Sequence, residues 1–175
     1  ACFLVPGVKI RVVDKRSEGS AEPFEFVSRG GLADLVDHLS SGGNACEVIT
    51  LSGIDSFTER VPVDGKMTDV QRECLVEVAL RWVKGYETRV ESFVNTIPTS
   101  HGGTHTAGFD RALTRAVNDV LLKDTRKLAK LAKDNKHRAI KEDVQEGLVA
   151  ACKVVFAEPQ FRGQTKQELG TPAIE

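Results

Sequence analysis

Short stretches in which apolar and polar residues alternate recur along the chain, as expected for strands that bury one face. Alternation over 8–12 and 24–26 predicts two strands near the start, and residues 47–51 predict a third. Residues 148–156 instead form a nearly continuous apolar run. Such a run predicts a central strand that is covered on both faces.

The middle of the chain predicts a β-hairpin. Apolar residues occupy alternate positions over 76–82 and again over 90–94, with a Lys-Gly pair between the two stretches, and that arrangement is typical of two strands joined by a tight turn. The preceding residues, 53–72, are interrupted by glycine, proline and aspartate. We expect loops there around one short extended piece at 57–63.

Helical periodicity occurs in at least two places. Residues 32–39 carry leucine and valine at positions i, i+3, i+4 and i+7, and residues 109–121 carry a longer apolar stripe. Thr104 is placed to cap the second of these helices. A further helical stretch is expected around 128–132, and a short helix is expected to begin near Glu142.

The order of these elements is strands, helix, strands, helices and a last strand, which predicts the α+β class. We expect a two-layer sandwich in which one mixed or antiparallel sheet has its helices packed on one face. Residues 1–175 are enough for one domain with its own core, and they contain no internal repeat.

Composition agrees with a globular domain and excludes several classes. Apolar residues make up 41% and charged residues 28%, and the net charge of −1 does not point to a nucleic-acid partner. No apolar run approaches the roughly 20 residues of a membrane span, and no signal peptide opens the chain, so we expect a cytoplasmic protein without a membrane partner. None of the four cysteines stands in a C-x-x-C pair, which predicts reduced thiols and no metal site.

Basic residues are concentrated in one stretch, residues 123–141, where eight lysines and arginines face two aspartates. One interpretation is a surface that contacts DNA phosphates, with Lys127, Lys130 and Lys133 as the candidate contacts. The other is a solvated helix face with extended lysine side chains, which is the more common situation for such a run.

Two glycine-containing segments are candidates for phosphate binding. Gly102 and Gly103 precede a predicted helix, whose first N–H groups can hold an anion, but the pair suits a tight turn equally well. Gln164 and Lys166 follow the buried strand, where an amide and an ammonium group can reach a phosphate. No Ser-His-Asp, Cys-His or paired-carboxylate arrangement stands out, so we expect no complete catalytic site in this chain.

Several motifs, taken together, resemble a known family. They are Pro98-x-x-x-Gly102-Gly103-Thr104-His105-x-x-Gly108-Phe109, Glu142-Asp143-Val144-Gln145-Glu146-Gly147-Leu148 and Glu158-Pro159-Gln160-Phe161-x-Gly163-Gln164-Thr165-Lys166-x-x-Leu169-Gly170. In this order and spacing they are similar to the second domain, called the transducer, of the B subunits of bacterial type IIA topoisomerases, namely DNA gyrase and topoisomerase IV. The resemblance covers the chain apart from residues 53–72 and 123–138, and it does not distinguish gyrase from topoisomerase IV.

The resemblance implies a fold shared with a ribosomal-protein domain (its domain 2), with a left-handed βαβ crossover. It implies that the domain follows an ATPase domain in the same subunit and couples ATP binding and hydrolysis to DNA-strand passage. In that role Gln164 and Lys166 contact the γ-phosphate of ATP, and Lys166 is the catalytic candidate.

The resemblance also implies the cofactors and partners of the full enzyme, an ATP-hydrolysing type II topoisomerase. These are ATP and Mg²⁺, the topoisomerase A subunit in a heterotetramer, and double-stranded DNA, in the bacterial cytoplasm at the nucleoid. The ATPase domain and the metal-binding cleavage domain are expected to lie outside residues 1–175, so this fragment alone is expected to bind no cofactor and to be inactive.

Two other classes of function stay open on the residues alone. One is a protein-interaction module without a link to nucleotide, which dependence of ATP turnover on Lys166 would exclude. The other is a stand-alone nucleic-acid-binding domain, which sequence-independent binding unaffected by Gln164 or Lys166 would favour.

Overall fold

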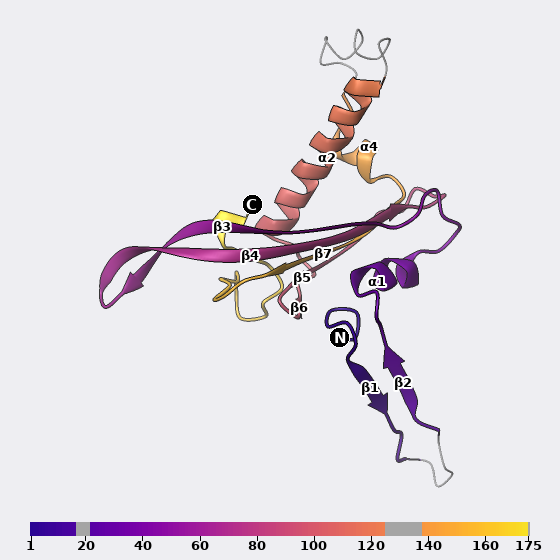
Figure 1. Cartoon of the computed structure of the whole chain (residues 1–175), viewed down its shortest axis with the longest axis horizontal. Helices are drawn as coiled ribbons and strands as arrows, with labels where there is room; N and C mark the ends of the chain where they lie inside the picture. Colours follow the sequence, from indigo (N-terminus) through magenta and orange to yellow (C-terminus); the bar gives the residue numbers. More distant parts are fainter. Residues whose placement is uncertain (17–21, 125–137, 175) are drawn as a thin grey trace.

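Five strands form one mixed sheet that runs through the middle of the molecule (Figure 1). The computed structural model describes residues 1–16, 22–124 and 138–174. All neighbouring strands pair antiparallel except β5 and β7, which run parallel, so the predicted α+β class with a mixed sheet is confirmed. Along the sheet the order is β3 (Ile49–Val63), β4 (Lys66–Trp82), β7 (Leu148–Val155), β5 (Arg89–Val94) and β6 (Ile97–Pro98).

β7 is the central strand, as its apolar run predicted, and its side chains are buried from Leu148 to Cys152 and again at Val154. Helix α1 (Leu32–Leu39) covers one face of the sheet and helix α2 (Thr104–Asp124) covers the other (Figure 1). The chain passes from β5 through β6, α2 and α4 (Lys141–Gln145) before it returns as β7.

The expected two-layer sandwich with helices on one face is wrong. Successive residues of a strand point to opposite faces of a sheet. Val149 of β7 belongs to an apolar cluster with Val36 of α1, whereas its neighbour Leu148 belongs to another with Leu113 of α2. Because both faces of β7 are apolar, each face needs its own helix.

β3 and β4 form a long hairpin, whose register runs from Ile49 opposite Leu80 to Val63 opposite Lys66. Residues 53–72, expected to be mostly loop, are therefore almost entirely strand. Asp64 and Gly65 turn the chain with positive φ angles of 49° and 78°, as a tight two-residue hairpin turn requires.

The predicted hairpin between 76–82 and 90–94 is also wrong. β7 lies between β4 and β5 and pairs with both, so these two strands never meet. An uninterrupted apolar strand needs a neighbour on each side and cover on each face, and the space between β4 and β5 provides both.

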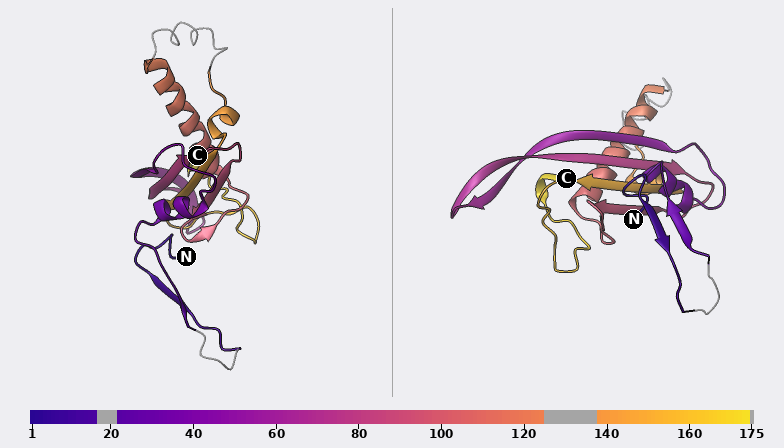
Figure 2. Two further views of the ribbon diagram at one scale, coloured as in Figure 1. Left: turned by 90° about the vertical axis from the view of Figure 1, so that its right-hand side faces the viewer. Right: turned by 60° about the horizontal axis from the view of Figure 1, so that its bottom comes forward.

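A second, two-stranded ribbon projects from the body of the molecule (Figure 2). It is formed by β1 (Lys9–Val12) and β2 (Phe24–Val27), which confirms the two strands predicted near the start. Its apolar side chains at Phe24 and Phe26 are exposed.

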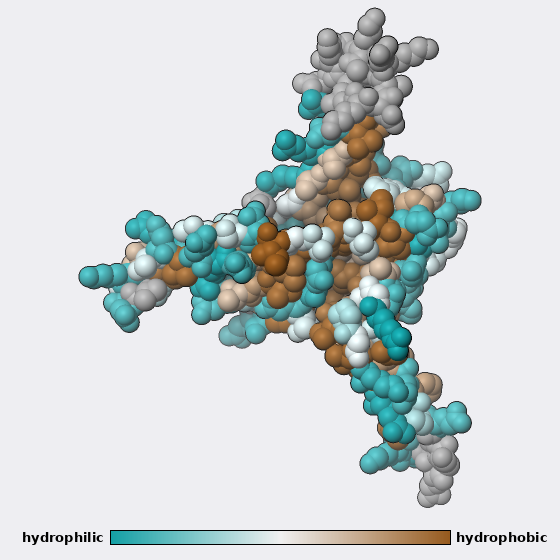
Figure 3. Space-filling view, viewed as in Figure 1, coloured by the Kyte–Doolittle hydropathy of each residue, from teal (hydrophilic) through white to brown (hydrophobic). Residues whose placement is uncertain are grey.

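The remaining helical elements are short. α4 confirms the helix predicted near Glu142, and a 3₁₀ turn, η1 (Pro172–Ile174), follows the last loop. The helical stretch expected around 128–132 lies outside the described residues. Hydrophobic residues are exposed along α2 and beside it on the sheet (Figure 3), so the predicted apolar stripe of α2 is only partly covered. Within the described ranges, no helix combines the length and hydropathy needed to cross a membrane.

Candidate functional site

The segment after β7 forms a loop whose two arms are hydrogen-bonded to each other. The Gly170 N–H donates to the Gln160 carbonyl at 2.8 Å, and the Arg162 N–H donates to the Glu168 carbonyl at 2.9 Å. The side chains of Arg162 and Glu168 add an ion pair at 2.7 Å. The predicted site residues Gln164 and Lys166 lie at the exposed tip between these arms.

The tip has an unusual backbone. Gly163 has a φ of 84° and Lys166 a φ of 56°, so a lysine occupies a region that side chains other than glycine, asparagine and aspartate seldom adopt. The Lys166 ammonium lies 6.0 Å from the centre of the Phe161 ring. Such a backbone costs free energy and persists only where the surrounding structure holds it, as it also does at Asp64, Asn95 and Glu158.

The other glycine-containing candidate, Gly102-Gly103, turns out to be the surface on which this loop docks. The Leu169 N–H donates to the Gly102 carbonyl at 3.0 Å, and the Thr104 N–H donates to the Leu169 carbonyl at 3.1 Å. A Cβ on Gly103 would lie 2.3–2.8 Å from backbone atoms of Leu169. Glycine is therefore required at 103 because another segment of backbone approaches it closely.

These contacts also answer the question of an anion site at this helix start. The Gly102 N–H donates to the Thr99 carbonyl at 2.8 Å and the Gly103 N–H to Thr106 Oγ1 at 3.0 Å. Since the Thr104 N–H is also used, the tight-turn interpretation is the one that the geometry supports. The cap expected from Thr104 is wrong, because its hydroxyl donates to the Thr171 carbonyl at 2.8 Å instead.

His105 links the first turn of α2 to strand β5 through Thr99. It is 3% exposed, and its Nε2 lies 3.2 Å from Oγ1 of Thr99, which in turn contacts the Ser92 hydroxyl of β5 at 2.7 Å. Burial lowers the pKa of His105 to about 4, so the imidazole is neutral at pH 7.

We therefore expect the domain to lose stability as the pH falls from 6.5 to about 4, the window between the ordinary pKa of histidine and that of His105. In this window the unfolded chain binds a proton that the folded chain does not, and the effect is at most about 3 kcal/mol. Denaturant unfolding at several pH values should show a steeper decline for the natural chain than for His105→Gln. Parallel declines would contradict the prediction.

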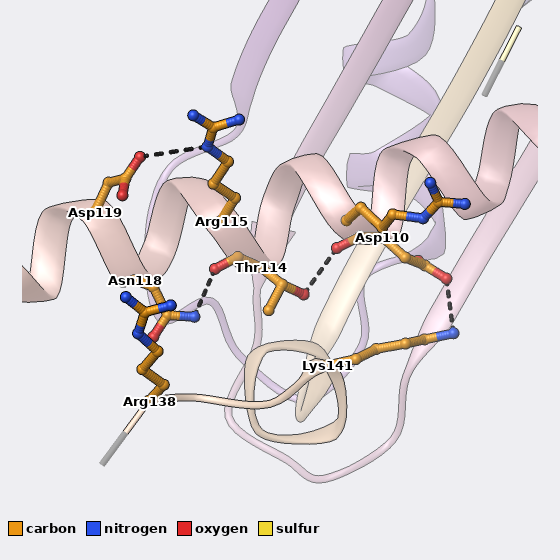
Figure 4. Close-up of a pocket in the computed structure, with 8 residues that line it drawn as sticks. Asp110, Thr114, Arg115, Asn118, Asp119, Arg138 and Lys141 are labelled. Carbon is orange, nitrogen blue, oxygen red and sulfur yellow. Dashed lines mark hydrogen bonds and ion pairs between the residues drawn. The ribbon is translucent and has the colours of Figure 1, made fainter. Parts of the chain in front are cut away.

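A pocket of about 590 Å³, lined by polar and charged residues, lies between α2 and residues 138–141 (Figure 4). Four basic and two acidic side chains are among its lining residues, so the pocket carries net positive charge. Lys141 and Asp110 form an ion pair at 2.6 Å, and Asn118 makes two hydrogen bonds to the backbone of Ala139. The candidate DNA contacts Lys127, Lys130 and Lys133 lie outside the described residues.

The sequence model of the family "DNA gyrase B" matches residues 31–175. This chain belongs to the DNA gyrase B family. It is 37% identical over 172 residues to the DNA gyrase B protein of Streptococcus pneumoniae serotype 4, an alignment that covers 98% of this chain and 24% of that protein. The DNA gyrase B protein of Treponema pallidum is 38% identical over the same length, with the same coverage. The chain thus spans about a quarter of the length of the curated relatives it matches.

Solved structures place the fold in the same family. The 43K ATPase domain of Thermus thermophilus gyrase B, in complex with an aminocoumarin, superposes with a TM-score of 0.62 at 29% identity, over 98% of this chain and 40% of that chain. The DNA gyrase B protein of Myxococcus xanthus has the same fold, with a TM-score of 0.65 at 22% identity over 99% of this chain and 47% of that chain. The family expected from the motifs is confirmed, and the transducer assignment within it stays a prediction.

Proposed function

We propose that this gyrase B family chain is the transducer region of a type II DNA topoisomerase B subunit, either DNA gyrase or topoisomerase IV. In this role it couples ATP binding and hydrolysis in a preceding ATPase domain to the passage of DNA. The observation that carries the proposal is the paired loop, which presents Gln164 and Lys166 at an exposed tip while its base is docked on Gly102-Gly103.

The chemistry of the tip suits a terminal phosphate. Glu168, the acid closest to Lys166 in the loop sequence, is paired with Arg162, which leaves the ammonium charge of Lys166 available for a ligand. In a closed site, an ammonium–phosphate contact contributes about 1.5–3 kcal/mol, and the Gln164 amide adds an orienting donor. Lys166 would also stabilise negative charge on the phosphoryl group during transfer.

This contact supplies a switch. It exists only while the γ-phosphate is attached and the loop is docked, so hydrolysis removes the reason for the two domains to stay together. ATP and Mg²⁺ would be held by the ATPase domain, and this chain would contribute the two side chains of the tip.

Four further expectations follow from membership of the transducer group. They are a left-handed crossover between β5 and β7, a likeness to a ribosomal-protein domain, a topoisomerase A subunit as partner, and double-stranded DNA as substrate at the bacterial nucleoid. The net positive charge of the pocket in Figure 4 supports DNA lying near α2. Two of the basic residues that line the pocket, Arg138 and Lys141, belong to the same basic stretch of sequence as Lys127, Lys130 and Lys133.

Chemical labelling tests the γ-phosphate contact directly. In the full-length protein, a non-hydrolysable ATP analogue should slow acylation of Lys166 by an amine-reactive reagent about tenfold, because a bound phosphate keeps the ammonium protonated and shielded. ADP should not protect it. Lys84, which is exposed and distant in sequence from the loop, serves as the control and should react equally in all states. Equal protection of Lys166 by ADP and the ATP analogue would contradict the contact.

A further inference from the structure

The long β3–β4 hairpin packs against the two hydrogen-bonded arms of the loop that carries Gln164 and Lys166. These arms, residues 160–162 and 168–170, are called the stem below. Phe57 of β3 packs edge to face on Phe156, the residue that follows β7, with 5.8 Å between the ring centres. Both rings belong to an apolar cluster that also contains Leu169, the residue docked on Gly102-Gly103. The hairpin and the loop therefore share one small core.

A polar contact accompanies this apolar one. Glu59 of β3 and Arg72 of β4 form an ion pair with 2.8 Å between Oε2 and Nε, and their side chains are only 9% and 11% exposed. Gln160, in the loop stem, donates from Nε2 to the other carboxylate oxygen of Glu59 at 2.8 Å. Arg72 also bonds Glu158, just before the stem.

The nearly buried carboxylate of Glu59 depends on both Arg72 and Gln160. A carboxylate removed from water is costly unless charge and hydrogen bonds compensate it. Arg72 supplies the charge from within the hairpin, and Gln160 supplies a donor from the loop. The Gln160–Glu59 hydrogen bond therefore links the hairpin directly to the loop.

Gln160 in turn holds both arms of the loop together. Its carbonyl accepts the Gly170 N–H at 2.8 Å, and its N–H donates to Thr171 Oγ1 at 3.0 Å. The next residue, Phe161, lies beneath the Lys166 ammonium. A short path of contacts therefore leads from the buried Glu59 to the tip.

We infer that Glu59 and Gln160 are positioning residues for the tip, and that the β3–β4 hairpin sets where Lys166 stands relative to a bound phosphate. The inference rests on the proposed role of Lys166. Neither residue touches the nucleotide. They act through the stem, and the hairpin becomes a lever through which a load on its far end alters phosphate contact.

The test is a double-mutant cycle in the full-length protein, read as ATP turnover. Gln160→Leu removes the donor to Glu59 and is expected to lower kcat about tenfold with little change in KM, since misplacement of a charged group by a fraction of an ångström weakens catalysis more than binding. In a Lys166→Ala background the same substitution should have almost no further effect, because Gln160 acts only through Lys166. Gln160→Lys, which again donates to Glu59, should restore most of the activity.

A matched control is available on the same hairpin. Arg60 and Asp69 form an exposed pair at 4.0 Å, with side chains 72% and 74% exposed, so Asp69→Asn should leave kcat unchanged. An unchanged kcat for Gln160→Leu beside a collapsed one for Lys166→Ala would overturn the inference and leave the proposed function standing. Equal losses from Gln160→Leu in both backgrounds would also overturn it. A normal kcat for Lys166→Ala would refute the proposed function itself, and this inference with it.

Discussion

Replacing Lys166 by alanine is expected to lower the kcat of ATP hydrolysis by the full-length protein on the order of a hundredfold. The lost interaction is strongest when charge builds up on the phosphoryl group, so kcat falls more than the affinity for ATP. Steady-state turnover with saturating DNA and the partner subunit measures the effect.

The structure indicates that this loss would come without unfolding. Lys166 is exposed, and its ammonium lies 6.0 Å from the centre of the Phe161 ring. The thermal midpoint should therefore change by no more than about one degree, as for most exposed substitutions. Lys66→Ala, at the far tip of the hairpin, is the matched loss of an exposed lysine and should leave turnover intact. Comparable turnover in the natural protein and Lys166→Ala would remove the loop from the ATP cycle.

Replacing Gly103 by alanine is expected to destabilise the domain by about 2–5 kcal/mol, the second large effect. The new Cβ would stand 2.3–2.8 Å from backbone atoms of Leu169, and the φ of 133° is one that alanine rarely adopts. Neither the start of α2 nor the Leu169 backbone has room to yield, because two hydrogen bonds join them.

Thermal unfolding of the 175-residue chain followed by circular dichroism measures this destabilisation, and a midpoint lower by about 5–15 °C is expected. Gly53→Ala is the control, since a Cβ there meets nothing within 4 Å and its backbone is ordinary strand. A Gly103→Ala midpoint within about a degree of the natural one would mean that the loop detaches from the glycine pair freely. Turnover would then have to be measured to show whether docking matters.

Local sequence patterns predicted which segments form strands and helices better than they predicted which strands pair with each other. β7 and α1 were identified from apolar periodicity because they bury most of one or both faces, and α2 was identified from its apolar stripe although that stripe is only partly covered. The long hairpin was missed although Asp64-Gly65 is a strong turn signal, because the flanking strands extend beyond the core and carry few apolar residues there. The hairpin expected between 76–82 and 90–94 failed because sequence adjacency says nothing of a third strand that inserts later.

The site shows the same division. Gln164 and Lys166 could be chosen from their motif, and both lie at the exposed tip of a loop. The reason for Gly103 could not be read locally, because the backbone that approaches it belongs to Leu169. Glu59 and Arg72 could not be chosen from the sequence either. Nothing local distinguishes them from the other charged residues of the chain, and only the fold buries them and brings Gln160 beside Glu59.

The position of β7 has a consequence for how the chain is made. It is the last strand in sequence, yet it lies between β4 and β5. Until residues 148–155 leave the ribosome, the earlier hairpin and β5 lack the strand that pairs with both of them in the folded sheet. Unpaired strand edges are sites of aggregation in nascent chains, and long-range pairing makes sheet closure slow. A chain stopped before residue 148 would therefore lack the strand that joins its two halves, and folding of the sheet waits for the last 28 of the 175 residues.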